Sequence, residues 1–96
     1  MYNIYFDPEF EIILEDLGKE NPKLHDNVIK KITNIAETLS WSPNHYKNLR
    51  SPLQRYKRVH VNDSYVLIFM VNKSKKSVKF VDYDHHDNIY KKKSLF

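Results

Sequence analysis

The spacing of apolar residues changes once along this chain, from the period of a helix to the period of a strand. Between residues 8 and 40, apolar side chains recur every three or four positions, as they do on one face of a helix. From residue 57 onward they alternate with polar side chains, as they do in a strand with one buried face. Helices followed by a run of strands predict an α+β fold, in which a layer of helices packs on one face of a sheet.

Two start signals position the helices. Asp7-Pro8 and Asn21-Pro22 each combine an N-cap residue with a proline at the first helical position. The first helix is expected to end at Gly18, and the second to run from about residue 22 to residue 40. The first helix has one apolar stripe, made of Phe10, Ile13, Leu14 and Leu17. Because the link is so short, the two helices should form a hairpin whose apolar stripes are buried against the sheet.

Four strands are expected around this hairpin. Residues 2–6 form a short aromatic strand before the first helix. Residues 57–61, 65–71 and 78–83 form an antiparallel meander, and residues 84–96 a tail. The prediction is therefore β-α-α-β-β-β in a single domain of residues 1–96, with a small, mostly antiparallel sheet whose second face is open to solvent.

Composition excludes several classes of protein. The chain has no cysteine, which removes disulfide scaffolds, thiolate zinc sites and cysteine nucleophiles. A single glycine cannot build a glycine-rich phosphate loop. No apolar run approaches the ~20 residues of a membrane helix, and the first residues lack the basic start of a signal peptide. We therefore expect a cytoplasmic protein without a membrane partner.

Charge is distributed unevenly between the two parts of the chain. Residues 1–43 contain four lysines against eight acidic residues, a formal charge of −4. Residues 44–96 contain twelve lysines and arginines against four aspartates, a formal charge of +8. A basic half of this kind indicates a polyanionic partner, although a lysine-rich surface that only aids solubility would give the same numbers.

A small set of residues could carry chemistry on this basic half: Arg50, Arg58, His60, His85, His86 and Tyr90. Cleaving RNA without a metal requires removal of the 2′-hydroxyl proton, cations at the phosphate oxygens and a proton for the leaving 5′-oxygen. Histidine, tyrosine and arginine suit these tasks near neutral pH. Each residue also has a structural interpretation, as part of a solvated strand face, as a hydrogen-bonded histidine or as an anchor for the tail.

A metal site at Asp84-His85-His86-Asp87 is the competing interpretation of the two adjacent histidines. Neighbouring residues on an extended chain point in opposite directions, so the two imidazoles should diverge. We therefore expect neither a metal nor another cofactor. The lysine run at 91–93 is interpreted as a solvated tail.

Three segments together resemble the RelE/ParE toxin superfamily. They are Asn48-Leu49-Arg50, the stretch from Tyr56 to Tyr65 (YKRVHVNDSY), and the stretch from Asp82 to Tyr90 (DYDHHDNIY). The superfamily has a leucine-containing loop, a strand with alternating basic residues, a Gly-Asp-Tyr-Arg turn and a closing His-Arg-x-x-Val-Tyr. The helical hairpin also agrees, so the resemblance covers nearly the whole chain.

The resemblance matches individual positions of this chain to the pattern. Arg58 and His60 match the alternating basic residues, and Tyr65 matches the tyrosine after the turn. His86 matches the arginine four residues before the closing tyrosine, which is Tyr90. Two positions depart from the pattern. The turn has no glycine, and Val66 stands where the superfamily has an arginine, so Val66→Arg is expected to raise cleavage.

The resemblance implies a toxin of a type II toxin–antitoxin system, which cleaves mRNA on the ribosome and is silenced by an antitoxin. His86 or His85 would be the general acid and His60 or Tyr90 the general base. The phosphate-binding residues would be Arg50, Arg58, Lys57 and Arg55. The expected partners are mRNA on the ribosome and an acidic, helical, partly disordered antitoxin, with which a hetero-tetramer is one allowed assembly.

Two other functions remain open at this stage. The chain could be a non-catalytic, ParE-like module that inhibits a protein target such as gyrase. Alternatively, its main role could be to bind its antitoxin and repress their operator.

Overall fold

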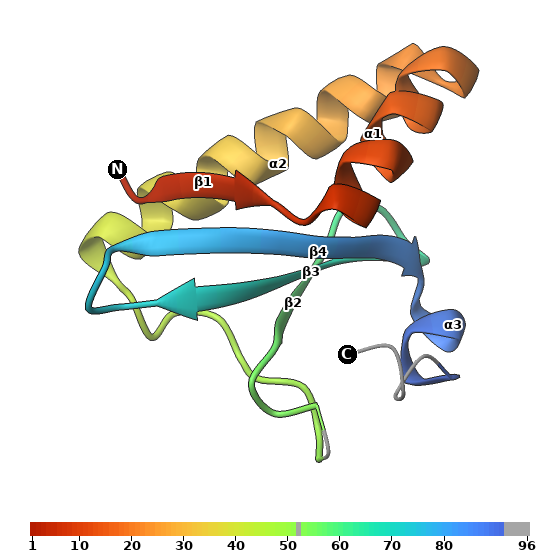
Figure 1. Ribbon diagram of the computed structural model, residues 1–96. Helices are drawn as coiled ribbons and strands as arrows, with labels where there is room; N and C mark the ends of the chain where they lie inside the picture. Colours follow the sequence, from red (N-terminus) through yellow and green to blue (C-terminus); the bar gives the residue numbers. More distant parts are fainter. Residues whose placement is uncertain (52, 92–96) are drawn as a thin grey trace.

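The computed structural model describes residues 1–51 and 53–91. Its elements are β1 (Asn3–Phe6), α1 (Pro8–Glu20), α2 (Pro22–Trp41), β2 (Lys57–His60), β3 (Tyr65–Asn72), β4 (Ser77–His85) and α3 (His86–Lys91). The sheet order is β1-β4-β3-β2; β1 pairs with β4 in parallel, and the other neighbours are antiparallel. Figure 1 shows α1 and α2 on one side of the sheet and α3 on the other. The predicted α+β order and mostly antiparallel sheet are confirmed.

Both predicted start signals act as helix caps. The Asp7 carboxylate accepts a hydrogen bond from the Glu9 amide at 3.0 Å, and the Asn21 side chain accepts one from the Leu24 amide at 3.2 Å. The prediction that α1 ends at Gly18 is wrong, because the helix continues to Glu20. Gly18 instead faces α2, where an added Cβ would lie 3.3 Å from Cδ2 of His25. The missing side chain thus lets the two helices approach closely.

The main core lies between the helical hairpin and the sheet. Phe10 of α1, Phe69 of β3 and Phe80 of β4 are fully buried, with ring centroids 5.5 to 6.1 Å apart for the pairs that share Phe80. Further fully buried members are Val28, Ile35, Ala36 and Leu39 of α2, Leu67 of β3 and Val78 of β4. Burial of these apolar side chains is the main force that holds the hairpin on the sheet.

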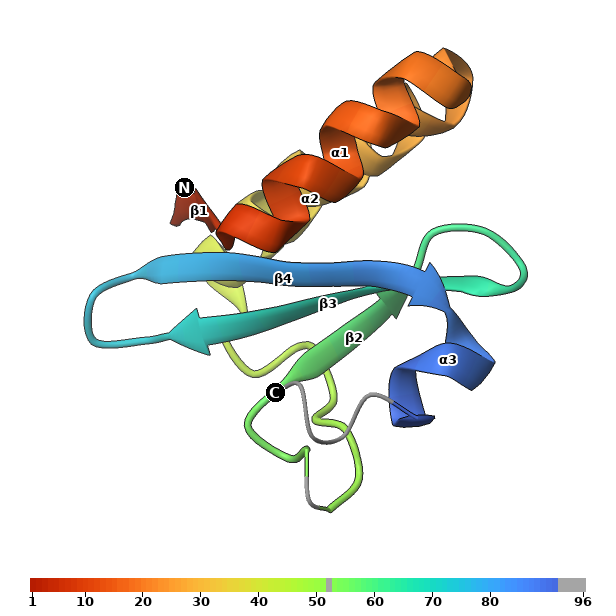
Figure 2. The ribbon, with the colours of Figure 1, turned by 45° about the vertical axis from the view of Figure 1, so that its right-hand side comes forward.

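The second face of the sheet is partly covered, so the prediction that it is open to solvent is wrong for this part. Val66 and Ile68 of β3 belong to a second buried cluster with Leu49, Leu53, Tyr56 and Ile89. These partners come from the loop of residues 42–56 and from α3, which Figure 2 shows on the side of the sheet away from α1 and α2. We refer to this side as the loop face.

The chain after Tyr83 is more ordered than predicted. Instead of a tail from residue 84, β4 continues to His85 and α3 follows directly. The fully buried Ile89 fixes α3 to the loop face. Residues 92–96, which include most of the expected lysine tail, lie outside the described residues. Among the described helices, none has the length and apolar character needed to span a membrane.

A bulge in β4 decides which of its side chains reach the loop face. Phe80 pairs with Phe69 and Asp82 pairs with Ile68, so Val81 has no partner of its own. Phe80 lies in the main core, whereas Ile68 lies in the second cluster. Directly paired residues share a face, so the bulge moves Asp82 to the loop face.

Candidate functional site

Two exposed basic residues lie on the loop face at the edge of the sheet. Arg58 and His60 alternate along β2 with Val59, which packs against the main core. β2 is the last strand of the sheet, and both side chains are exposed. Within residues 1–51 and 53–91, the side chains of Arg58 and His60 form no hydrogen bond or ion pair, so both groups can contact a ligand.

Strand register aligns these two residues with two carboxylates across the sheet. Arg58 pairs with Ile68, which pairs in turn with Asp82. His60 pairs with Val66, which pairs in turn with Asp84. Adjacent strands are about 4.8 Å apart, so each basic residue lies roughly 10 Å from its carboxylate row partner at the backbone. Val66 and Ile68 form an apolar floor between the basic and the acidic rows.

Asp82 was not among the residues predicted from the sequence to form a site, and Asp84 was considered only as a metal ligand. Asp82 is buried, and its carboxylate accepts a hydrogen bond from the Tyr83 amide at 2.8 Å. The Asp84 carboxylate accepts one from the His85 amide at 2.7 Å and one from the Asn88 side chain at 3.2 Å. Strand parity puts Asp82 and Asp84 on one face, but the β4 bulge decides that this is the loop face, and the sequence gives no signal for the bulge.

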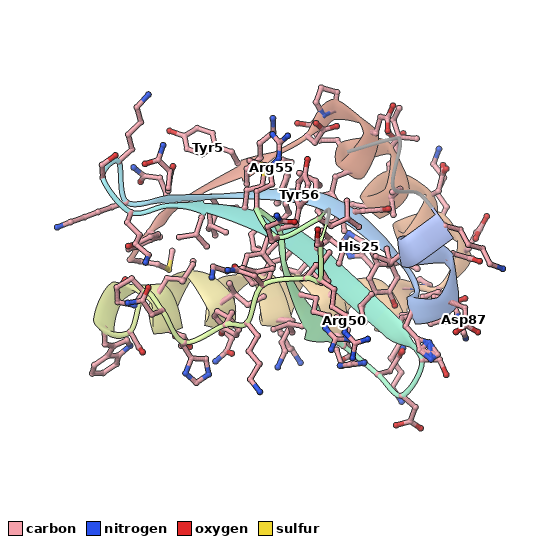
Figure 3. All side chains as sticks on the ribbon, turned by 90° about the horizontal axis from the view of Figure 1, so that it is seen from below. Tyr5, His25, Arg50, Arg55, Tyr56 and Asp87 are labelled. Carbon is pink, nitrogen blue, oxygen red and sulfur yellow. The ribbon has the colours of Figure 1, made fainter. Side chains whose placement is uncertain are left out.

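The loop of residues 42–56 brings two more arginines to the loop face. The Leu49 amide donates to the Tyr56 carbonyl at 2.8 Å, which closes the loop, and Leu49 and Leu53 anchor it in the second cluster. Arg50 and Arg55 remain exposed on it. Figure 3 views this face and shows Arg50, Arg55 and Tyr56 in front of the strands, with Asp87 beyond them at the α3 end. The Arg55 guanidinium lies 5.7 Å from the Tyr56 ring centroid.

Lys57 has a different environment from the arginines. It shares the helix side of β2 with Val59, opposite to Arg58 and His60. Its ammonium donates to the Tyr46 carbonyl at 3.0 Å and to the Asn48 side chain at 2.9 Å. Burial, and then the nearby charge of Lys73, lowers the pKa of Lys57. Lys57 therefore ties the start of the loop to β2 and lies apart from the other predicted phosphate-binding residues.

The two adjacent histidines lie at the junction between β4 and α3. His85 ends the strand and pairs with Tyr65, whereas His86 begins α3. The His86 amide donates to the Ser64 carbonyl at 2.9 Å, which fixes the junction beside the β2–β3 turn. The two imidazole centroids are 4.6 Å apart. The expectation that these side chains diverge is wrong, because the chain stops being extended at His85.

The aromatic residues beside His85 lie on the helix side of the sheet. The Tyr65 ring stacks on Tyr83 at 5.3 Å and meets the His85 ring edge-on at 5.7 Å. Tyr83 packs against the main core, on the helix side of the sheet. His85, two residues further along β4, and its partner Tyr65 lie on this same side, opposite to Arg58 and His60. Burial raises the pKa of the Tyr83 hydroxyl, an effect that Asn62 partly opposes. Tyr90 lies within α3, and its side chain is outside the described residues.

Comparison with known proteins gives strong relatives for the whole chain. No family model matches it. A protein of Methanocaldococcus jannaschii named "Putative toxin RelE4" is 49% identical over 96 residues, which is 100% of this chain and 98% of the relative. The chain belongs to the RelE-like toxin superfamily. This confirms the family that the three sequence segments resemble.

Solved structures of RelE-like toxins agree with this fold. A metal-bound toxin from Helicobacter pylori has a TM-score of 0.72 at 22% identity, covering 93% of this chain and 99% of that one. The toxin–antitoxin complex RelBE2 from Mycobacterium tuberculosis has a TM-score of 0.66 at 22% identity, covering 88% and 98%. At these identities the comparison establishes the fold.

Proposed function

We propose that this RelE-like chain is the toxin of a type II toxin–antitoxin pair and that it cleaves mRNA on the ribosome without a metal. The observation that carries the proposal is the exposed pair Arg58 and His60 on one face of an edge strand, in a chain 49% identical to a protein named as a toxin. A cation and a titratable imidazole side by side suit the cleavage of a phosphodiester.

Phosphate binding is assigned to arginines on the loop face. Arg58 on β2 and Arg50 and Arg55 on the loop are exposed, and guanidinium groups bind phosphate oxygens with two parallel hydrogen bonds. In this assignment Arg58 stabilises the negative charge that develops on the phosphorane oxygens as the 2′-oxygen attacks. Lys57 contributes indirectly by holding the loop that carries Arg50.

Proton transfer is assigned to His60 and His86. His86 is favoured over His85 as the general acid because it stands four residues before Tyr90, where the family pattern has a charged residue; its ring lies 4.6 Å from that of His85 at the junction of β4 and α3. His60, on the face of Arg58, would accept the proton of the 2′-hydroxyl, and Tyr90 is the alternative base. His86 would then protonate the leaving 5′-oxygen.

A second function is favoured by one observation, the burial of Val66. The superfamily pattern has an arginine at this position, whereas here the side chain is 1% exposed beneath the loop and α3. A site that lacks this cation clamps phosphate less strongly. The corresponding proposal is a ParE-like module that binds a protein target and cleaves nothing.

Single-turnover cleavage of mRNA on purified ribosomes separates the two functions. General acid–base catalysis contributes about 10²–10⁴-fold, so His86→Ala should slow cleavage by that factor while ribosome binding stays nearly intact. His45→Ala, which removes an exposed histidine from the loop before β2, is the matched control and should cleave at the wild-type rate. A second comparison sets wild type against a His60→Ala/His86→Ala double variant. If both arrest growth equally and neither produces cleaved mRNA, the nuclease function is rejected and the binding module is supported.

The partner proposed for this toxin is an acidic antitoxin. The +8 charge of residues 44–96 favours an acidic segment that orders on binding, and such a pair would act in the cytoplasm. Co-expression with the neighbouring reading frame should yield a co-purifying complex, and light scattering would show whether it is a hetero-tetramer. A toxin that arrests growth and has no neutralising neighbour would contradict this pairing.

A further inference from the structure

The junction of β4 and α3 gathers three metal-ligating side chains that the proposed reaction does not use together. His85, His86 and Asp87 each offer one ligand atom, and these atoms lie within 4.8 Å of one another. The Nδ1 atom of His86 is 3.5 Å from one Asp87 carboxylate oxygen, and Nδ1 of His85 is 3.7 Å from the other. Both imidazoles therefore lie beside one carboxylate. Nδ1 of His85 also accepts a hydrogen bond from the Asp87 amide at 3.2 Å, so a metal would either displace this bond or bind His85 through Nε2.

His86 provides a second, independent observation. Its Nδ1 atom is buried and has no hydrogen-bond partner among the described residues. Buried polar atoms are satisfied in the great majority of cases, and one that is not indicates a missing partner, such as an ion. A metal ion would accept this lone pair and draw in the Asp87 carboxylate, whose side chain is 70% exposed and free to rotate.

We propose that His85, His86 and Asp87 form a binding site for a divalent transition metal such as Zn²⁺. With bonds of 2.0–2.2 Å, a tetrahedral ion holds its ligand atoms roughly 3.3 Å apart, so the ligand atoms must approach one another by at most about 1.5 Å. Rotation of three partly exposed side chains supplies this contraction. Two nitrogens and one carboxylate oxygen suit Zn²⁺, Ni²⁺ or Cu²⁺ better than Mg²⁺ or Ca²⁺, and water would occupy the fourth position.

The surrounding backbone is already held in the required shape. Asp84 accepts hydrogen bonds from the His85 amide and the Asn88 side chain, and the Ser64 carbonyl accepts one from the His86 amide. These contacts join β4, α3 and the β2–β3 turn around the cluster. Such support orients the ligands and reduces the entropy lost when a metal binds.

Metal binding would also regulate the proposed reaction. A metal on Nδ1 of His86 prevents this imidazole from becoming imidazolium, so occupancy of the site would leave His86 a far weaker acid for the leaving oxygen. This consequence rests on the proposed function, whereas binding itself does not. Zn²⁺ would then act as an inhibitor of cleavage and not as its cofactor.

Calorimetric titration of the full chain with ZnCl₂ tests binding directly. Wild type should bind one ion, and Asp87→Ala and His85→Ala should each weaken binding by at least about tenfold, since loss of even an outer-shell partner costs 10–100-fold. His45→Ala is the matched control and should bind like wild type. In NMR spectra of the imidazole carbons, Zn²⁺ should shift the signals of His85 and His86 and leave that of His45 in place.

The outcomes separate this proposal from the proposed function. Equal Zn²⁺ affinity in wild type and in the Asp87→Ala and His85→Ala variants would overturn the site, whatever the cleavage assay shows. One-site binding that both variants weaken would support it even if the protein cleaves no mRNA. If it does cleave, Zn²⁺ should slow wild type more than Asp87→Ala, each measured against its own metal-free rate.

Discussion

Replacing Val66 by arginine tests whether the loop and α3 cover the sheet in solution. Val66 is 1% exposed and packs in the second cluster with Leu49, Leu53 and Ile89. The family pattern alone predicts that an arginine here restores a phosphate-binding cation. The structure instead leads us to expect that the guanidinium is forced into an apolar cluster, or that the loop and α3 are pushed away from the sheet.

The expected cost follows from burial. An uncompensated buried charge typically costs about 3–5 kcal/mol. Overpacking adds about 1–3 kcal/mol, and Asp84, which pairs with Val66 across the strands, offsets part of the total. We therefore expect a loss of roughly 3 kcal/mol or more from the free energy of unfolding, against about 5–15 kcal/mol for a typical domain.

Urea denaturation followed by circular dichroism measures this loss. With a slope of at most about 3 kcal/mol per molar, the midpoint of Val66→Arg should fall by at least about 1 M. Ile12→Arg places the same side chain at an exposed position of α1 and should change stability by no more than about 0.5 kcal/mol. If Val66→Arg has the same urea midpoint as wild type and cleaves mRNA faster, the inference that the loop and α3 bury Val66 is refuted.

Two further predictions concern a buried hydroxyl and the arginines of the loop face. Among the described residues the buried Tyr83 hydroxyl has no hydrogen bond of normal geometry, although the Asn62 side chain lies near it, so Tyr83→Phe should be about as stable as wild type at pH 7. Because its folded pKa is raised, wild type should lose stability as the pH rises above 10.0 and Tyr83→Phe should lose less; parallel denaturation curves at alkaline pH would argue against this. For Arg58→Ala and Arg50→Ala, a plot of the logarithm of ribosome affinity against the logarithm of salt concentration should be less steep by about one unit each. This is the change expected when one phosphate contact is lost. Lys30→Ala, an exposed change on α2, is the control, and a slope unchanged in both arginine variants would remove those residues from the RNA contact.

Local chemistry made much of this fold predictable. Asp7 and Asn21 are followed by proline, which fixes where α1 and α2 start whatever the rest of the chain does. The alternation around Val59 placed Arg58 and His60 together on one strand face, because side-chain direction in a strand depends on parity alone. The family resemblance was likewise carried by short local segments.

Tertiary contacts decided the rest, because they depend on residues far apart in the sequence. Gly18 is a helix-ending residue by local preference, yet α1 continues past it because α2 packs close beside it at His25. By the family pattern Val66 is a gap in a phosphate site, whereas its burial depends on Leu49 and Ile89 from two distant segments.

The candidate site shows the same division. Sequence parity would place Asp82 on the same side of β4 as Phe80, in the main core. The bulge at Val81 reverses that parity and turns Asp82 toward the row of Arg58. Likewise, His85 and His86 diverge if the chain stays extended, and they meet because α3 begins between them. The sequence alone determined which residue types are available for the site. Which of them lie close together was decided by the register of β4 against β3 and by the packing of α3, and both depend on the burial of Val66 and Ile68.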